Sequence, residues 1–91
     1  GIEGSRARTD HYPEASFEQV MDVNVTGLWR CMKAQLPVLV GQQRGCIINI
    51  ASVAGLKGFP AHCAYAASKH AVIGLTKTAA MEFVRYNIRI N

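Results

Sequence analysis

The chain has 91 residues, of which 49% are hydrophobic and 18% charged, and its formal net charge is +4. The ten basic residues are scattered from Arg6 to Arg89 without a cluster that alternates with aromatic residues, which argues against nucleic-acid binding. No apolar run approaches the length of a membrane-spanning helix and no signal peptide is visible, so we expect no membrane partner.

The three cysteines, Cys31, Cys46 and Cys63, are odd in number and form no C-x-x-C pair. This pattern favours free thiols in a reducing compartment over a disulfide framework. We therefore expect a cytoplasmic protein.

The first secondary-structure element that we expect is a long helix from Ser16 to about Gln42, after a polar surface loop over residues 1–13. Ser16 and Gln19 have the spacing of a capping box, in which the serine hydroxyl accepts a hydrogen bond from an amide of the first turn. Apolar residues recur at helical spacing along this segment: Phe17, Met21, Val25, Leu28, Met32, Leu36 and Leu39. This stripe predicts a helix that faces a core or a partner helix.

Gly27 and Pro37 interrupt this helical pattern. Glycine weakens a helix, and proline removes a hydrogen bond and clashes with the preceding turn. We therefore expect two helical segments that meet near Asn24, with a kink or local break at Pro37.

An apolar, β-branched run, Ile47-Ile48-Asn49-Ile50, predicts a buried strand from Cys46 to Ala51. Residues 52–61 contain glycines and Pro60 and are expected to form a loop.

A second helix is predicted from about His62 to Tyr86, and the apolar alternation over residues 87–91 then predicts a second strand. One face of this helix carries mostly small residues: Ala64, Ala67, Ala71, Gly74, Thr78 and Met81. Such a face lets another helix approach closely.

Two strands joined by a helix indicate an α/β fold with a parallel sheet, in the order helix–strand–helix–strand. A two-stranded parallel sheet cannot cover its own faces, and parallel sheets are normally buried on both sides. We therefore expect residues 1–91 to be the middle of a larger α/β domain.

The candidate site combines Ser52, at the end of the predicted strand, with Tyr65 and Lys69 in the first turns of the second helix. Tyr65 and Lys69 are four residues apart, which places them on the same helix face. In open α/β sheets, ligands bind at the carboxyl ends of the strands. A hydroxyl, a phenol and an ammonium at that place suit proton transfer.

Tyr65 is the candidate general acid and base. A free phenol titrates near pH ~10, which is too high for a good base at neutral pH, but a nearby ammonium favours the phenolate. Lys69 supplies that ammonium, and Ser52 can hydrogen-bond the substrate oxygen and stabilise its developing charge. The alternative is that the three residues have only structural roles, with Tyr65 half-buried on its helix, Lys69 solvated at the surface and Ser52 in a turn.

These residues resemble the core of the short-chain dehydrogenase/reductase family. The marks are the pair in Tyr65-Ala66-Ala67-Ser68-Lys69 and Ser52 thirteen residues upstream, in a segment 49–52 that resembles the family's Asn-x-Ser-Ser. Ala51 replaces the first of these two serines. Residues 22–27, 73–77 and 88–91 also fit the family pattern, so nearly the whole chain is covered.

The resemblance implies a partial Rossmann-like domain, a doubly wound parallel sheet in which residues 1–91 are the central part. The glycine-rich dinucleotide loop would precede this part and most of the substrate pocket would follow it. It further implies an NAD(P)-dependent oxidoreductase that interconverts an alcohol and a carbonyl. We expect these 91 residues alone to be inactive.

The resemblance also assigns residue roles. The catalytic residues would be Asn24, Ser52, Tyr65 and Lys69, with Asn24 holding a water that links Lys69 to solvent. Tyr65 and Lys69 would bind the cofactor, NAD or NADP, and Ser52 and Tyr65 the small-molecule substrate. A homodimer or homotetramer would form through the two long helices.

One other hypothesis for the function remains open. The chain could belong to a non-catalytic binding or oligomerisation module that keeps the same residues. His62, Cys63 and His70 lie near the site in sequence, but their spacing matches none of the usual zinc patterns, so we expect no metal. His62 and Cys63 could instead line the substrate entrance.

Overall fold

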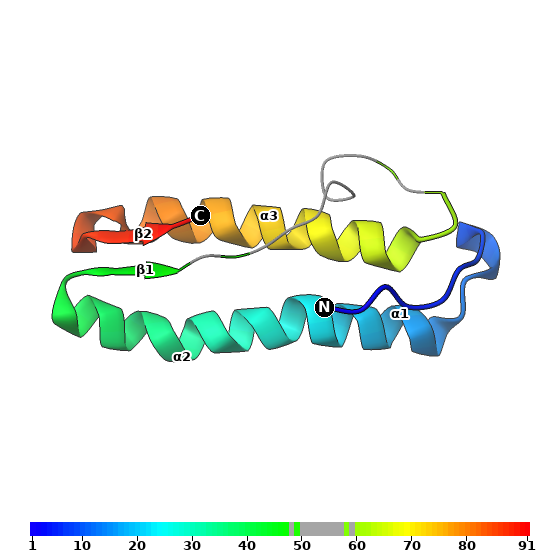
Figure 1. Ribbon diagram of the computed structural model, residues 1–91, viewed down its shortest axis with the longest axis horizontal. Coiled ribbons are helices and arrows are strands. Elements are labelled where there is room, and N and C mark those ends of the chain that lie inside the picture. Colours follow the sequence, from blue (N-terminus) through cyan, green and yellow to red (C-terminus); the bar gives the residue numbers. More distant parts are fainter. Residues whose placement is uncertain (48, 50–57, 59) are drawn as a thin grey trace.

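The computed structural model describes residues 1–47, 49, 58 and 60–91. Its elements follow in the order η1 (Thr9–His11), α1 (Glu14–Met21), η2 (Asp22–Thr26), α2 (Gly27–Gln42), β1 (Gly45–Ile47), α3 (Cys63–Phe83), η4 (Val84–Tyr86) and β2 (Ile88–Ile90) (Figure 1). The molecule is elongated, at 47 × 22 × 15 Å, because α1, η2 and α2 form one long helical rod with α3 lying alongside it. The predicted order helix–strand–helix–strand is confirmed.

The first helix begins at Glu14 rather than at Ser16, so the predicted capping box is wrong. Pro13 precedes the helix without a side-chain cap, and its carbonyl accepts the first helical hydrogen bond from Phe17 N at 3.0 Å. Ser16 therefore lies inside the first turn. Its hydroxyl accepts a hydrogen bond of 2.9 Å from Ser5 N, which ties the N-terminal segment to α1.

The rod changes its hydrogen-bond pattern where two segments were predicted to meet. The segment η2 is a π-helix that contains Asn24, and the Gly27 N–H at its end reaches back five residues to Asp22 O. Such single π turns occur frequently at functional sites. Farther on, α2 remains helical through Pro37, so the predicted local break is absent.

The two strands pair in parallel, with Cys46 opposite Arg89. The ladder extends past β1, since Asn91 N donates to Ile47 O at 3.0 Å and Asn49 N donates to Asn91 O at 2.7 Å. The predicted α/β class with a parallel pair is confirmed. The rest of the predicted strand, at positions 48, 50 and 51, lies outside the described residues.

The core lies where α2, α3 and the two strands meet. Its buried residues are Met32, Leu36, Ile47, Ala79, Ile88 and Ile90. A fully buried large aliphatic side chain contributes about 1.5–3 kcal/mol, so this cluster is the main force that holds the sheet to the helices.

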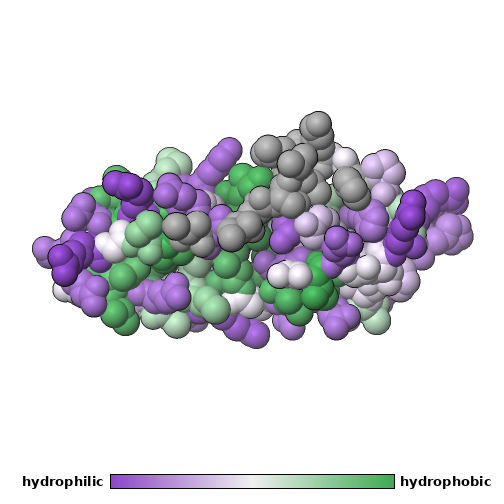
Figure 2. Space-filling model, in the orientation of Figure 1, coloured by the Kyte–Doolittle hydropathy of each residue, from purple (hydrophilic) through white to green (hydrophobic). Residues whose placement is uncertain are grey.

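Along β2, Ile88 and Ile90 are buried while Arg89 is exposed, so the helices cover one face of the sheet. Figure 2 shows hydrophobic and hydrophilic residues mixed over the half of the molecule that carries the strands, whereas the end where α1 begins is mainly hydrophilic. Within the described ranges, no helix is both long and apolar enough to cross a membrane.

Candidate functional site

Tyr65 and Lys69 lie one turn apart near the start of α3. Lys69 Nζ is 5.3 Å from the centre of the Tyr65 ring, and both side chains are half-buried. This confirms the prediction that they share a helix face. The carboxyl ends of β1 and β2 point towards the middle of the molecule, where the first half of α3 and the N-terminus also lie (Figure 1).

Asn24 is a buried polar residue of η2, with only 5% of its surface exposed. Its Oδ1 accepts a hydrogen bond from Ile2 N at 2.7 Å, and its Nδ2 donates to Ile2 O at 2.7 Å. Nδ2 also donates to Ser68 Oγ at 3.0 Å. Both N–H groups of the amide are therefore used, and the side chain is held in one orientation.

The side chains of Asn24 and Lys69 both lie close to the backbone of Gly1. A Cβ atom built on Gly1 would lie 2.8 Å from Asn24 Oδ1 and 3.0 Å from Lys69 Nζ. Such distances leave no room for a side chain at this position. Asn24 thus belongs to the same site as Tyr65 and Lys69, although it comes from a different element.

The N-terminal segment also fixes the start of α3. Ala7 N donates to Ala61 O at 2.8 Å, in a bridge that pairs Ala7 with His62. Ala61 has a φ of +67°, a left-handed conformation that is unfavourable for alanine by about 1–2 kcal/mol. Contacts of residues 1–7 therefore hold both η2 and the start of α3.

Ser52, the remaining predicted catalytic residue, lies outside the described residues. Asn49, three positions before it, is anchored to α3 by a hydrogen bond of 2.9 Å from its Nδ2 to Thr76 Oγ1. The structure thus fixes the chain shortly before Ser52.

Sequence reasoning missed three participants of this site: Gly1, Ile2 and Ser68. Ser68 lies between Tyr65 and Lys69 in the sequence motif, so its position could have indicated that it belongs to the site. Ile2 contributes only backbone groups, which leave no mark in a sequence pattern.

His62 and Cys63 are half-buried at the start of α3, and His70 Nδ1 lies 2.9 Å from Ala66 O. Among the residues that the structure describes, no group of three or more His, Cys, Asp or Glu side chains is arranged to hold a metal ion.

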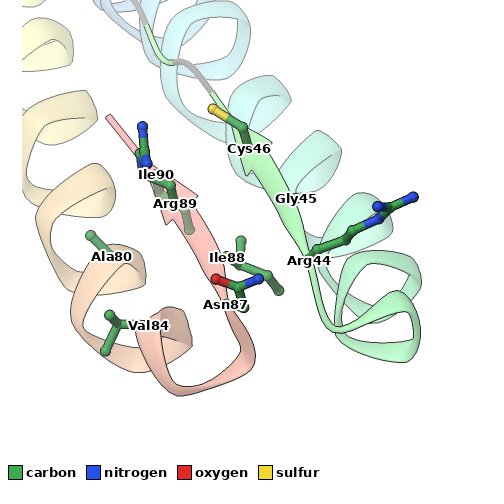
Figure 3. A pocket seen from close by; sticks show the side chains of 9 residues that line it. All are labelled: Arg44, Gly45, Cys46, Ala80, Val84, Asn87, Ile88, Arg89 and Ile90. Atoms are coloured by element: carbon green, nitrogen blue, oxygen red, sulfur yellow. The ribbon is translucent and has the colours of Figure 1, made fainter.

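Two hollows lie away from this site. One, of about 510 Å³, lies beside the strands and the end of α3, and its lining includes Arg44, Cys46 and Arg89 (Figure 3). The other, of about 630 Å³, is an apolar groove between α2 and α3. Neither is lined by Asn24, Tyr65 or Lys69.

Comparison with known proteins identifies the family. A family model described as short chain dehydrogenase matches residues 1–91. Levodione reductase of Leifsonia aquatica is 40% identical over 91 residues, which are 100% of this chain and 34% of that protein. A 2,5-dichloro-2,5-cyclohexadiene-1,4-diol dehydrogenase of Sphingobium indicum is 47% identical over 76 residues, 82% of this chain and 30% of that protein.

Solved structures agree with this assignment. NAD+-bound xylitol dehydrogenase superimposes with a TM-score of 0.97 and 44% identity, covering 100% of this chain and 35% of the other. ElxO with NADP bound gives a TM-score of 0.97 and 41% identity, covering 100% of this chain and 37% of the other. The chain therefore belongs to the short-chain dehydrogenase/reductase family and has part of its Rossmann fold. It spans about a third of the length of these relatives.

Proposed function

We propose that the protein containing this chain is an NAD(P)-dependent oxidoreductase that interconverts an alcohol and a carbonyl. The observation that carries the proposal is that Lys69 lies beside the Tyr65 ring and, next to the Gly1 backbone, also near Asn24. The relatives' names support it, since they are dehydrogenases and reductases, and solved neighbours hold NAD+ or NADP.

In the proposed mechanism, Tyr65 is the general acid and base. During alcohol oxidation, the Tyr65 phenolate accepts the proton of the substrate hydroxyl while the carbon–hydrogen bond breaks as hydride. In carbonyl reduction, Tyr65 returns that proton to the new alkoxide. Lys69 is proposed to assist this transfer, because its ammonium lies 5.3 Å from the centre of the Tyr65 ring.

A nicotinamide cofactor, NAD or NADP, supplies the hydride acceptor or donor when it is bound. Lys69 suits a role in holding it, because within the described residues the ammonium lies beside the Tyr65 ring and the Gly1 backbone and forms no ion pair. Its three N–H donors are therefore available to a bound hydroxyl group. Ser52 is proposed to hydrogen-bond the substrate oxygen beside Tyr65.

Asn24 is proposed to support proton relay to Lys69. Because both N–H groups of its amide are already donated, a relayed water would bind the free lone pair of Oδ1 or the backbone of η2. The role of the Asn24 side chain is then to hold η2 and the Gly1–Ile2 backbone beside Lys69.

The test of the proposal is Tyr65→Phe in the complete protein. We expect turnover to be abolished while cofactor binding, measured by calorimetric titration, is largely kept. Tyr12→Phe is the matched control, because the Tyr12 hydroxyl lies 3.4 Å from Ser16 Oγ and is not placed in the site. Full activity of the Tyr65→Phe protein would refute the proposal.

The alternative is a non-catalytic module of the same family. We propose that residues 1–91 are the central part of one dinucleotide-binding domain and are inactive alone. The sequence that precedes the chain discriminates between the two functions. A strand followed by closely spaced glycines and a helix would favour the enzyme, because such a loop cradles the phosphates of the cofactor.

We further propose that a second copy of this chain covers the groove between α2 and α3, giving a homodimer or homotetramer. The groove is lined mainly by apolar residues of both helices, including Trp29, which is 45% exposed. It also carries Lys33 from α2 and Glu82 from α3, so two copies related by a two-fold axis offer charges of opposite sign to each other.

The three thiols are free, which supports the expected reducing, cytoplasmic location.

A further inference from the structure

Ser68 is the most buried polar residue of the described chain that the proposed mechanism does not use. Its exposed fraction is 0%, and it lies on α3 between Tyr65 and Lys69. Its hydroxyl accepts a hydrogen bond from Asn24 Nδ2 at 3.0 Å and donates one to Tyr65 O at 2.8 Å. Ser68 therefore connects η2 directly to the turn of α3 that carries the candidate general base.

The direction of each hydrogen bond in this chain of contacts is determined by its partners. The Ile2 N–H needs an acceptor, so the oxygen of the Asn24 amide must face it and the nitrogen must face Ile2 O and Ser68 Oγ. A backbone carbonyl accepts only, so the Ser68 hydroxyl proton points to Tyr65 O. Each N–H and O–H group in the series of hydrogen bonds from Asn24 through Ser68 to Tyr65 O therefore has an acceptor.

Local helix stability does not explain a serine at this position. Alanine has a higher helix propensity, and a serine that bonds back to its own helix slightly destabilises it. The neighbouring positions Ala66, Ala67 and Ala71 show that this turn accommodates alanine. An alanine at position 68 would lose the hydrogen bond from Asn24 as well as the bond back to Tyr65 O.

We propose that Ser68 is a positioning residue of the candidate active site. By fixing the Asn24 amide against the turn between Tyr65 and Lys69, it sets where η2 and the Gly1–Ile2 backbone lie relative to the Lys69 ammonium. Gly1 links the position of η2 to that of the Lys69 ammonium, because its backbone lies close to both Asn24 Oδ1 and Lys69 Nζ. The inference rests on the proposed function, because it assigns a role in the same reaction.

The experiment compares Ser68→Ala, Asn24→Ala and the double variant in the complete protein, at saturating cofactor. We expect Ser68→Ala to lower kcat about tenfold with the KM for substrate changed less than twofold, and to move the pH–rate profile. If Ser68 acts through Asn24, adding Ser68→Ala to Asn24→Ala lowers kcat by less than twofold more. Full additivity of the two losses would overturn the inference.

Ser16→Ala is the control for a purely structural loss. It removes another serine hydroxyl that accepts a backbone hydrogen bond, on α1 and away from the site. We expect it to lower the melting temperature without changing kcat per cofactor-binding site or the pH profile. Should Ser68→Ala fail to fold, Ser68→Cys is measured instead, and a wild-type kcat and pH profile for it would overturn the inference.

The outcome also separates the two proposals. An active Tyr65→Phe protein contradicts the proposed function itself. An inactive Tyr65→Phe protein together with a fully active Ser68→Ala protein contradicts only the role of Ser68.

Discussion

Asn24 and Ser68 are 44 residues apart in the sequence and are joined by a hydrogen bond of 3.0 Å between Nδ2 and Oγ. The bond connects the π-helical segment η2 to α3, and Asn24 also holds both backbone groups of Ile2. Three segments of the chain therefore meet at one amide side chain. The arrangement around Asn24 leads to the first two predictions below.

Asn24→Asp is expected to destabilise the complete protein strongly. The carboxylate has no N–H to give to Ile2 O or Ser68 Oγ, and an unsatisfied buried group costs about 1–3 kcal/mol, more for a charged one. Chemical denaturation measures the free energy of unfolding. Gln35→Glu, the same change at an exposed site on α2, is the control and should differ little from wild type. Equal stability of the two variants would contradict the observed hydrogen bonds.

Gly1→Ala is expected to reduce both turnover and stability. The added Cβ would lie 2.8 Å from Asn24 Oδ1, which is fixed, and 3.0 Å from Lys69 Nζ, which ends a flexible side chain and would move. We expect kcat to fall about tenfold and the melting temperature to fall as well, because the Asn24 amide cannot move away without weakening its hydrogen bonds. At Gly41, on the exposed end of α2, an added Cβ meets no atom within 4 Å, so Gly41→Ala should leave kcat unchanged. A wild-type kcat for Gly1→Ala would show that Lys69 does not need its observed position.

Trp29→Arg is expected to weaken the proposed pairing of two copies through the groove between α2 and α3. The indole is 45% exposed beside this groove, and replacing it with arginine removes apolar contact area and adds a second positive charge next to Lys33, which opposes association. Val23→Arg is a matched control, because Val23 is also 45% exposed but does not line the groove. Sedimentation at micromolar concentration should show monomer for Trp29→Arg and the larger species for Val23→Arg and wild type. Monomer for the wild type would reject the pairing.

Much of the fold could be predicted because its signals are local. Helical spacing of apolar residues predicted the helices, and the β-branched run at Ile47 predicted the first strand. Tyr65 and Lys69 could be placed together because one helix carries both.

The parts that failed depend on contacts distant in the sequence. Ser16 has the spacing of a cap, yet the N–H of Ser5 engages its hydroxyl and Pro13 precedes the helix. Pro37 was expected to kink or locally break the helix, and the helix continues through it without a break. The link between Asn24 and Ile2 spans 22 residues and uses backbone groups, so no sequence pattern reports it.

The most direct test concerns the Lys69 ammonium and the Tyr65 phenol, which α3 holds in contact. The measurement is the pH dependence of kcat for alcohol oxidation by the complete protein, at saturating cofactor, for wild type and Lys69→Met. The account predicts that Lys69→Met loses turnover across the pH range measured, because the ammonium that assists Tyr65 and holds the cofactor is gone. Profiles of wild type and Lys69→Met that superimpose would contradict it.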